Sequence, residues 1–361
     1  MSFGTHASSI GRLCAAMGIL MWSLSTPAVA CDICAVYVST EMSESRTGFS
    51  LGVAEQFTRF GTLQLGGEEV PNPAGEYLNS SVTQLLLSYA LMRRLHFQLN
   101  LPIIVRDYRR LEDDGVVDGD ESGIGDLALT ALFNVWTYVD EASVVRFSLF
   151  GGVKFPTGNS DRLGEELDEG HHSAEDDAEG EEEHDHGDAE DGHVHVHVAP
   201  HHVHDEADDE HVESGIHGHD LALGSGSYDG IVGGRLYASW RRAFLSATVQ
   251  YTPTSTGSFD YAYADGLTWS GGPGVYAWLG HGTTLGLMAV LSGQTKGNDE
   301  LDGTKLNDTA ITSLFVGPGL LFTWGTSLAV DIAGDLPVIQ NNTSLQIVAD
   351  YRIRGGAVWR F

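Results

Sequence analysis

From residue 45 to the C-terminus, apolar and polar residues alternate in segments of about ten or more residues, separated by turn residues. In the clearest segment, 95–108, one face is apolar and carries Leu95, Phe97, Leu99, Leu101, Ile103 and Val105. The opposite face is largely polar, with Ile104 as its apolar exception. A period of two residues predicts β-strands whose two faces lie in different surroundings. Lipid and a polar lumen are such surroundings, but a water-soluble sandwich shows the same alternation.

Segments of this kind recur along the whole of 45–361. They cover residues 45–60, 77–92, 95–110, 123–138, 143–156, 227–240, 243–254, 262–279, 283–294, 309–324, 326–337 and 344–361. Twelve is an even number, as expected for a bacterial outer-membrane barrel made of one chain. We therefore predict an all-β fold: a transmembrane, antiparallel, up-and-down β-barrel of about twelve strands over residues 45–361.

The connections between the segments differ in length at the two ends. Those after the even-numbered segments are short, at Arg93-Arg94, Asp140-Glu141, Arg241-Arg242, His281-Gly282 and Gly325. Those after the odd-numbered segments are mostly longer and acidic or rich in Gly and Asn, near 61–76, 111–122, 157–226, 255–261, 295–308 and 338–343. Short periplasmic turns alternating with longer external loops are typical of outer-membrane barrels. A soluble sandwich has no reason to sort its loops in this way.

The last segment favours the membrane setting further. Residues 354–361 read Arg-Gly-Gly-Ala-Val-Trp-Arg-Phe. They resemble the C-terminal signal of outer-membrane barrels, polar-x-Gly-x-x-aromatic-x-aromatic, with Gly356, Trp359 and Phe361 in register. We expect this strand to be recognised by the barrel-assembly machinery and to pair with the first strand.

The N-terminus predicts export. Arg12, an apolar stretch over 13–24 and Ala28-Val29-Ala30 form the pattern of a signal peptide, residues 1–30. The following segment, 31–44, is expected to lie in the periplasm. It contains Cys31 and Cys34, and an exported pair of this kind favours a disulfide. A metal site and lipidation of Cys31 remain open as alternatives.

Composition supports the all-β prediction, with 45 Gly and only 10 Pro, and charge sets one segment apart. Residues 157–220 hold 23 acidic residues and one basic residue, Arg162, and so account for −22 of the net charge of −31. Such a segment buries too little apolar surface to offset the entropy of ordering. We predict that 157–226 is a disordered external loop inserted in the barrel.

Thirteen of the sixteen histidines lie in this insertion. Imidazole suits Zn²⁺, Ni²⁺ and Cu²⁺, and a flexible tract would bind several ions weakly, so no tightly bound cofactor is expected. The alternative is a solvated acidic brush that repels other anions. The candidate metal ligands are His171, His172, His184, His186, His193, His195, His197, His201, His202, His204, His211, His217 and His219.

Three short passages resemble a family of outer-membrane barrels associated with the meta-pathway of phenol degradation. They are residues 151–158 (Gly-Gly-Val-Lys-Phe-Pro-Thr-Gly), 224–229 (Gly-Ser-Gly-Ser-Tyr-Asp) and 122–127 (Ser-Gly-Ile-Gly-Asp-Leu). The resemblance covers about 45–361 and implies the same fold and a role in passage across the outer membrane. It carries over no catalytic or binding residue. The His-rich insertion departs from the family pattern, so a phenolic substrate is not implied.

The leading functional hypothesis is an outer-membrane channel or transporter for small solutes. The predicted lumen-lining residues are His96, Gln98, Asn100, Arg106, Asp126, Asn134, Arg146, Lys154, Arg235, Gln250, Asp331, Asp350, Arg352 and Arg354. Mixed charges in a polar lumen can select solutes by size and sign, although the same groups could pair with one another and close it.

A second hypothesis is a metal-capturing binding protein with a closed lumen. An enzyme is not expected: the sequence has no G-x-S-x-G elbow and no compact Ser/His/Asp set, so no catalytic residue is predicted. The expected partners are outer-membrane lipid, small solutes or divalent metal ions, and the barrel-assembly machinery, with no nucleic acid.

Overall fold

The computed structural model describes residues 47–112, 115–167 and 214–361. The predicted signal peptide, Cys31 and Cys34, and the eleven histidines from His171 to His211 lie outside the described residues. No helix in the described part of the chain is long and apolar enough to cross a membrane.

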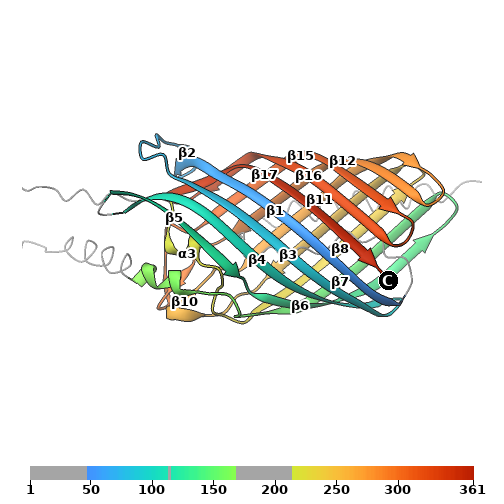
Figure 1. The fold of residues 1–361 in the computed structure, drawn as a ribbon, viewed down its shortest axis with the longest axis horizontal. Helices are drawn as coiled ribbons and strands as arrows, with labels where there is room; N and C mark the ends of the chain where they lie inside the picture. The colour runs from blue at the N-terminus through green and yellow to red at the C-terminus, as the bar shows by residue number, and fades with distance from the viewer. Residues whose placement is uncertain (1–46, 113–114, 168–213) are drawn as a thin grey trace, which may run out of the picture.

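The described chain forms a closed antiparallel barrel of twelve strands, whose strands run obliquely to its long axis (Figure 1). Each of the twelve predicted segments overlaps one of them, which confirms the predicted fold. Around the barrel they are β1 (Gly48–Leu65), β3 (Tyr77–Met92), β4 (Leu95–Glu112), β6 (Leu127–Val139), β7 (Ser143–Phe155), β8 (Asp229–Trp240), β9 (Ala243–Thr252), β11 (Gly266–Leu279), β12 (Thr283–Lys296), β15 (Ile311–Trp324), β16 (Leu328–Asn342) and β17 (Leu345–Arg360).

The seam between the first and last strands closes the sheet. β1 pairs with β17 from Ser50↔Arg360 to Leu65↔Leu345, with irregularities near Phe60. The backbone N–H of Phe361 adds one more bond, donated to the carbonyl of Phe49 over 3.0 Å. No barrel strand is left with an open edge along this seam, which is the condition for placing a sheet in lipid.

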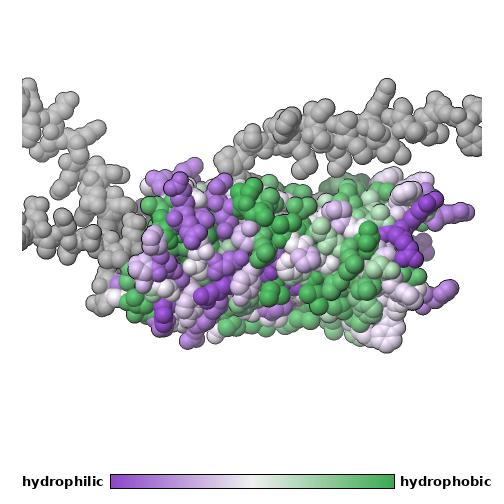
Figure 2. All heavy atoms as spheres, turned by 90° about the horizontal axis from the view of Figure 1, so that it is seen from above, coloured by the Kyte–Doolittle hydropathy of each residue, from purple (hydrophilic) through white to green (hydrophobic). Residues whose placement is uncertain are grey.

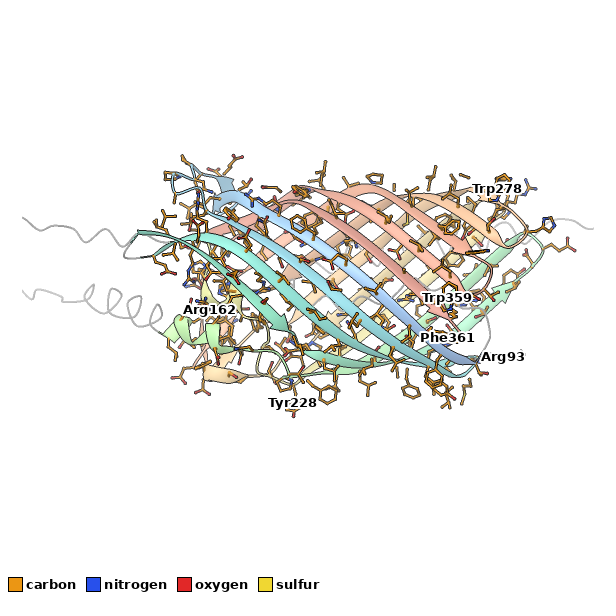
Figure 3. The ribbon with its side chains drawn as sticks, in the orientation of Figure 1. Arg93, Arg162, Tyr228, Trp278, Trp359 and Phe361 are labelled. Carbon is orange, nitrogen blue, oxygen red and sulfur yellow. The ribbon has the colours of Figure 1, made fainter. Side chains whose placement is uncertain are left out.

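The outer surface of the barrel is apolar. Outward side chains such as Leu87, Leu149 and Leu320 are more than 40% exposed, and Figure 2 shows apolar residues gathered between polar ends. A ring of aromatic residues lies at the end with the short turns, as Trp278, Trp359 and Phe361 illustrate in Figure 3. Its exposed tryptophans are Trp136, Trp240, Trp278, Trp324 and Trp359. An apolar band with an aromatic girdle is the surface of a barrel that lies in lipid.

The predicted difference between the two ends is confirmed, with local corrections. The sixth external connection is only the two-residue turn 343–344, because β16 continues to Asn342 beyond the predicted end at 337. Residues 111–122 are not a loop. Most of them form β5 (Gly115–Ile124), which pairs with the outer half of β4. Because both faces of β5 are polar or weakly apolar and partly exposed, it lacks the alternation that predicted the other strands.

Further short elements lie in the external connections. These are β2 (Glu68–Glu69), the 3₁₀ turns η2 (Asp161–Gly164) and η3 (Ser258–Asp260), helix α3 (Gly218–Leu221), and a small sheet of β10 (Tyr261–Ala262), β13 (Glu300–Leu301) and β14 (Thr304–Lys305). The range predicted to be disordered, 157–226, is therefore too wide. Its two ends, 157–167 and 214–226, fold against the barrel because they carry apolar residues that become buried, among them Leu163, Ile216 and Leu221.

Candidate functional site

Two cavities follow one another inside the barrel. The first, of ≈ 130 Å³, lies at the short-turn end, where Phe49, Thr326 and Phe361 contribute to its wall. The second, of ≈ 210 Å³, lies farther inside, between Gln84, Thr268 and Asp331. Arg235 and Tyr237 line both cavities and so mark the boundary between them. The lumen is thus a column of space that begins at the short-turn end and is lined by both polar and apolar side chains.

The predicted lumen residues do lie on inward faces, but polar contacts position many of them. Arg352 donates from Nη2 to Oε1 of Gln294 over 2.9 Å and lies 4.0 Å above the ring of Phe315. Arg354 pairs with the buried carboxylate of Asp335. These contacts hold the two guanidinium groups against the wall of the second cavity. The space between the two groups therefore stays open.

The remaining predicted residues divide between the cavities and local pairs. His96, Gln98, Asn134, Arg146 and Arg235 line the first cavity, and Arg235, Gln250, Asp331, Arg352 and Arg354 line the second. Asn100 donates to Gln84 over 2.9 Å, and Asp350 accepts from Thr62 over 2.8 Å. Glu55, which was not predicted, lies on the face of β1 that also carries the exposed Leu51 and Val53, so it points away from the lumen and accepts from Ser81 and Thr83 of β3.

The external end of the barrel is filled by two stretches of the third connection, residues 156–167 and 214–228, here called the plug. Ile216 and Leu221 of the plug are buried with the barrel residues Leu63, Leu78, Tyr108 and Ile347. Leu223 packs on Val82 and Ile104, and Arg106 donates to the carbonyl of Ala222 over 2.9 Å. In Figure 1, α3 lies within the outline of the barrel at the end away from the short turns. Apolar burial therefore holds the plug inside the wall.

A second layer covers the plug. Leu163 and Ala222 are fully buried against Tyr261, Tyr263 and Leu301, which belong to the small sheet and the segment beside it. The hydroxyl of Tyr263 donates to the carbonyl of His219 over 3.0 Å. The external end is therefore closed by plug residues beneath and by later connections above.

A buried ionic network attaches the plug to the barrel wall. Lys154 lies 2.6 Å from Asp229 and 3.1 Å from Asp126, and all three side chains are at most 3% exposed. The Asp126 carboxylate also accepts from the backbone N–H groups of Gly158 and Ser225, both in the plug. The three passages that carried the family resemblance each supply one charged residue of this network. Their shared role here is to join the starts of β6 and β8 to the end of β7.

Arg162, the single basic residue of the acidic segment 157–220, fastens the other side of the plug. Its guanidinium lies 2.5 Å from Glu121 of β5 and donates to the hydroxyl of Tyr108 over 2.9 Å. It also pairs with Glu165, which in turn accepts from Arg110 of β4. Charge-assisted bonds of this kind orient the first half of the plug on the barrel rim.

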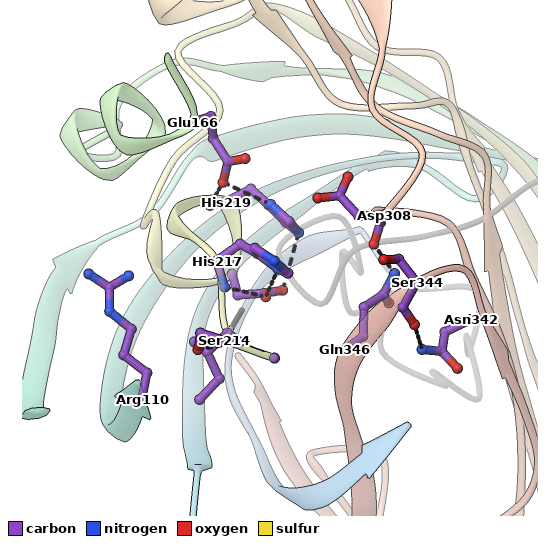
Figure 4. Close-up of polar contacts among 12 residues, drawn as sticks. Arg110, Glu166, Ser214, His217, His219, Asp308, Asn342, Ser344 and Gln346 are labelled. Carbon is purple, nitrogen blue, oxygen red and sulfur yellow. Dashed lines mark hydrogen bonds and ion pairs between the residues drawn. The ribbon is translucent and has the colours of Figure 1, made fainter. Parts of the chain in front are cut away.

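Two of the thirteen predicted metal ligands lie in the described chain, and the plug brings them together. The rings of His217 and His219 are stacked, with centroids 5.4 Å apart (Figure 4). Nδ1 of His219 lies 2.9 Å from Oε1 of Glu166, across the two stretches of the plug. Burial alone would lower the pKa of His219, but the carboxylates of Asp220 and Glu166 outweigh it and raise that pKa to about 10. The site thus favours positive charge on or beside the His219 ring.

A closed barrel with an apolar girdle, a polar lumen and a folded plug defines the class: this chain is a bacterial outer-membrane β-barrel. No family model and no curated protein sequence matches it. Its fold is similar to that of the COG4313 outer membrane channel from Pseudomonas putida F1, with 16% identity, coverage of 90% of this chain and 100% of that chain, and a TM-score of 0.53. It also matches the β domain of the Bordetella autotransporter BrkA, with 9% identity, coverage of 88% and 100%, and a TM-score of 0.40. The first likeness agrees with the fold that the sequence motifs implied.

Proposed function

We propose that the protein is an outer-membrane channel for small solutes whose lumen is closed from outside by the plug. The observation that supports this most directly is the column of two cavities inside the barrel, which ends beneath the plug. Side chains just fill the interior of a barrel of about eight strands, so a barrel of twelve strands leaves room for a lumen. The similar Pseudomonas putida protein is described as a channel as well.

The charges around the first cavity favour anionic solutes. Arg146, Arg235 and Arg360 line it together with His96. No Asp or Glu side chain lies among the described residues that line this cavity. A cavity lined by side chains of one sign of charge raises the local concentration of ions of the opposite sign. Small carboxylates are the solute class that this lining fits.

Planar-bilayer recordings test the proposal with a designed pair of deletions. The backbone N–H of Leu223 donates to the carbonyl of Asn159 over 3.0 Å, so residues 160–222 can be replaced by Gly-Gly in a four-residue β-turn. We expect this variant to conduct steadily, and the wild type to conduct rarely or not at all. The control, which lacks only 168–213, keeps every described plug contact and is expected to stay closed. A folded 160–222 deletion that passes no current would contradict the channel function.

The same recordings measure charge preference. Under a KCl gradient, we expect the reversal potential of the 160–222 deletion to favour chloride over potassium. Arg146→Gln in that background should lower the preference about fivefold, because one charge at about 4 Å contributes about 1 kcal/mol in water. A reversal potential that favours potassium would contradict the anionic solute class while leaving the channel itself intact.

A second candidate function is capture of divalent metal by the His-rich insertion. It is favoured by the two described histidines, His217 and His219, which the plug places side by side beside carboxylates. Zn²⁺, Ni²⁺ and Cu²⁺ are the ions that imidazole donors suit. Calorimetry should show more Zn²⁺ ions bound to the full chain than to the variant lacking 168–213; equal stoichiometry would exclude a metal role for the insertion.

A further inference from the structure

The start of α3 gathers three possible metal ligands in one place. His217 precedes the helix, and His219 and Asp220 lie within it. Each offers one ligand atom, and these atoms all lie within 4.8 Å of one another. Of the imidazole nitrogens, Nε2 of His219 lies 3.6 Å and Nδ1 of His217 lies 4.0 Å from the Asp220 carboxylate. Ligand atoms in a tetrahedral zinc site lie about 3.4 Å apart, so only small movements would complete this set.

One polar atom of this cluster is buried without a hydrogen-bond partner. Nδ1 of His217 is buried and has no hydrogen-bond partner among the described residues, and the side chain is only 12% exposed. Buried polar atoms in folded proteins are normally paired, and an exception calls for a ligand, an ion or a water molecule. Nδ1 of His217 is therefore a nitrogen that could bind a metal ion, next to two other potential ligands.

Glu166 supports His219 in the way that metal-binding histidines are supported. Its buried carboxylate accepts from Nδ1–H of the His219 ring over 2.9 Å and from the His219 backbone N–H over 2.7 Å. With Nδ1–H held by Glu166, Nε2 is the nitrogen through which His219 would bind a metal ion, in exchange for the proton on Nε2, and it is the nitrogen nearer to Asp220. Lys296, a nearby cation, is paired with Asp299 at 2.7 Å. The net charge of the side chains around the cluster is therefore negative, which favours binding of a cation.

We propose that His217, His219 and Asp220 bind one divalent transition-metal ion inside the plug, with Glu166 as the supporting carboxylate. Two imidazoles and one carboxylate suit Zn²⁺, Co²⁺ and Ni²⁺, with a fourth position left for water. This is a built site, distinct from weak binding along 168–213. Because Glu166 and His219 come from the two stretches of the plug, the bound ion stabilises their contact by mass action. Only the resulting effect on conductance rests on the proposed channel function; binding does not.

Metal titration of the variant lacking 168–213 isolates this site from the other eleven histidines. We expect one Co²⁺ per chain, with the visible absorption of a four-coordinate ion, and one Zn²⁺ that displaces it. His217→Ala and His219→Ala should each abolish the Co²⁺ spectrum. Glu166→Gln should weaken Zn²⁺ binding about 10- to 100-fold, the usual effect of losing a supporting carboxylate. His281→Ala is the matched control, because His281 lies in a short turn at the other end of the barrel. It should change neither the Co²⁺ spectrum nor the affinity for Zn²⁺.

The outcomes separate the alternatives. If no ion binds the deletion variant while the full chain still binds several, the metal ligands lie in 168–213 and the inference is wrong. Binding that persists in both His217→Ala and His219→Ala would place the ion elsewhere and overturn it as well. The heat-modifiable mobility of each variant on gels shows that the barrel has folded. Because no readout depends on current, a silent channel leaves the result interpretable.

Discussion

Replacing Lys154 by Met is expected to lower the free energy of unfolding by about 3–5 kcal/mol, the usual cost of removing one partner from a buried ion pair. The change removes the cation that lies between the Asp126 and Asp229 carboxylates, which are 1% and 0% exposed. Since the same network holds Gly158 and Ser225, the plug should loosen too, with more frequent openings in bilayer recordings.

Urea unfolding of the refolded barrel in detergent, followed by tryptophan fluorescence, measures this loss. Arg109→Met is the matched control, because it removes an ion pair with Asp118 whose side chains are 40% and 60% exposed. Such a pair contributes at most about 1 kcal/mol. Adding Asp126→Asn and Asp229→Asn to Lys154→Met should recover part of the loss by removing the unpaired charges. If Lys154→Met costs no more than the control, the network does not hold the plug.

Gly317→Ala is expected to destabilise the barrel by about 1–3 kcal/mol, the range for forcing extra atoms into a packed site. An added Cβ at Gly317 would lie 1.7 Å from the carbonyl oxygen of Gly334 and 3.0 Å from Cα of Asp335. Both are backbone atoms of β16, so no side-chain rotation can relieve the overlap. The strands must separate, and the Asp335 carboxylate would move away from Arg354 in the second cavity.

The neighbouring strand offers a matched control for this change. A Cβ added at Gly334 meets no atom within 4 Å, and neither glycine has a positive φ. Gly334→Ala should therefore be neutral within about 0.5 kcal/mol. Unfolding curves of the two variants under the same conditions make the comparison. Equal stability of Gly317→Ala and Gly334→Ala would show that the close approach of β15 and β16 is not required.

The strands of the barrel could be predicted because their evidence is local. Each strand repeats the same alternation over many residues, so an error at one position, such as Ile104, does not hide it. β5 was missed for the same reason, since a strand with two polar faces has no such period. The ends of β16 and of the sixth connection were misplaced because polar residues, Gln340 to Asn342, continue as strand once β15 is there to pair with them.

The plug could not be predicted because its evidence is scattered. Its buried apolar residues, such as Ile216, Leu221 and Leu223, stand singly beside a long acidic and histidine-rich stretch. Composition averaged over 157–220 therefore indicated disorder. Each of these side chains becomes buried only because the barrel wall supplies an apolar surface opposite it, and no local pattern reports that surface.

The sequence alone determined that this chain is a twelve-stranded barrel, which strand faces point inward, and that the segment before Phe361 is the closing strand. Those properties follow from a two-residue period and from turn residues, and both patterns can be recognised within a few consecutive residues of the chain. Only the tertiary structure decided that the lumen ends beneath a plug, that Lys154 is shared by Asp126 and Asp229, and that Glu166 faces His219. Those partners are 28 to 75 residues apart, and which of many inward polar groups meet depends on register and curvature around the whole closed sheet.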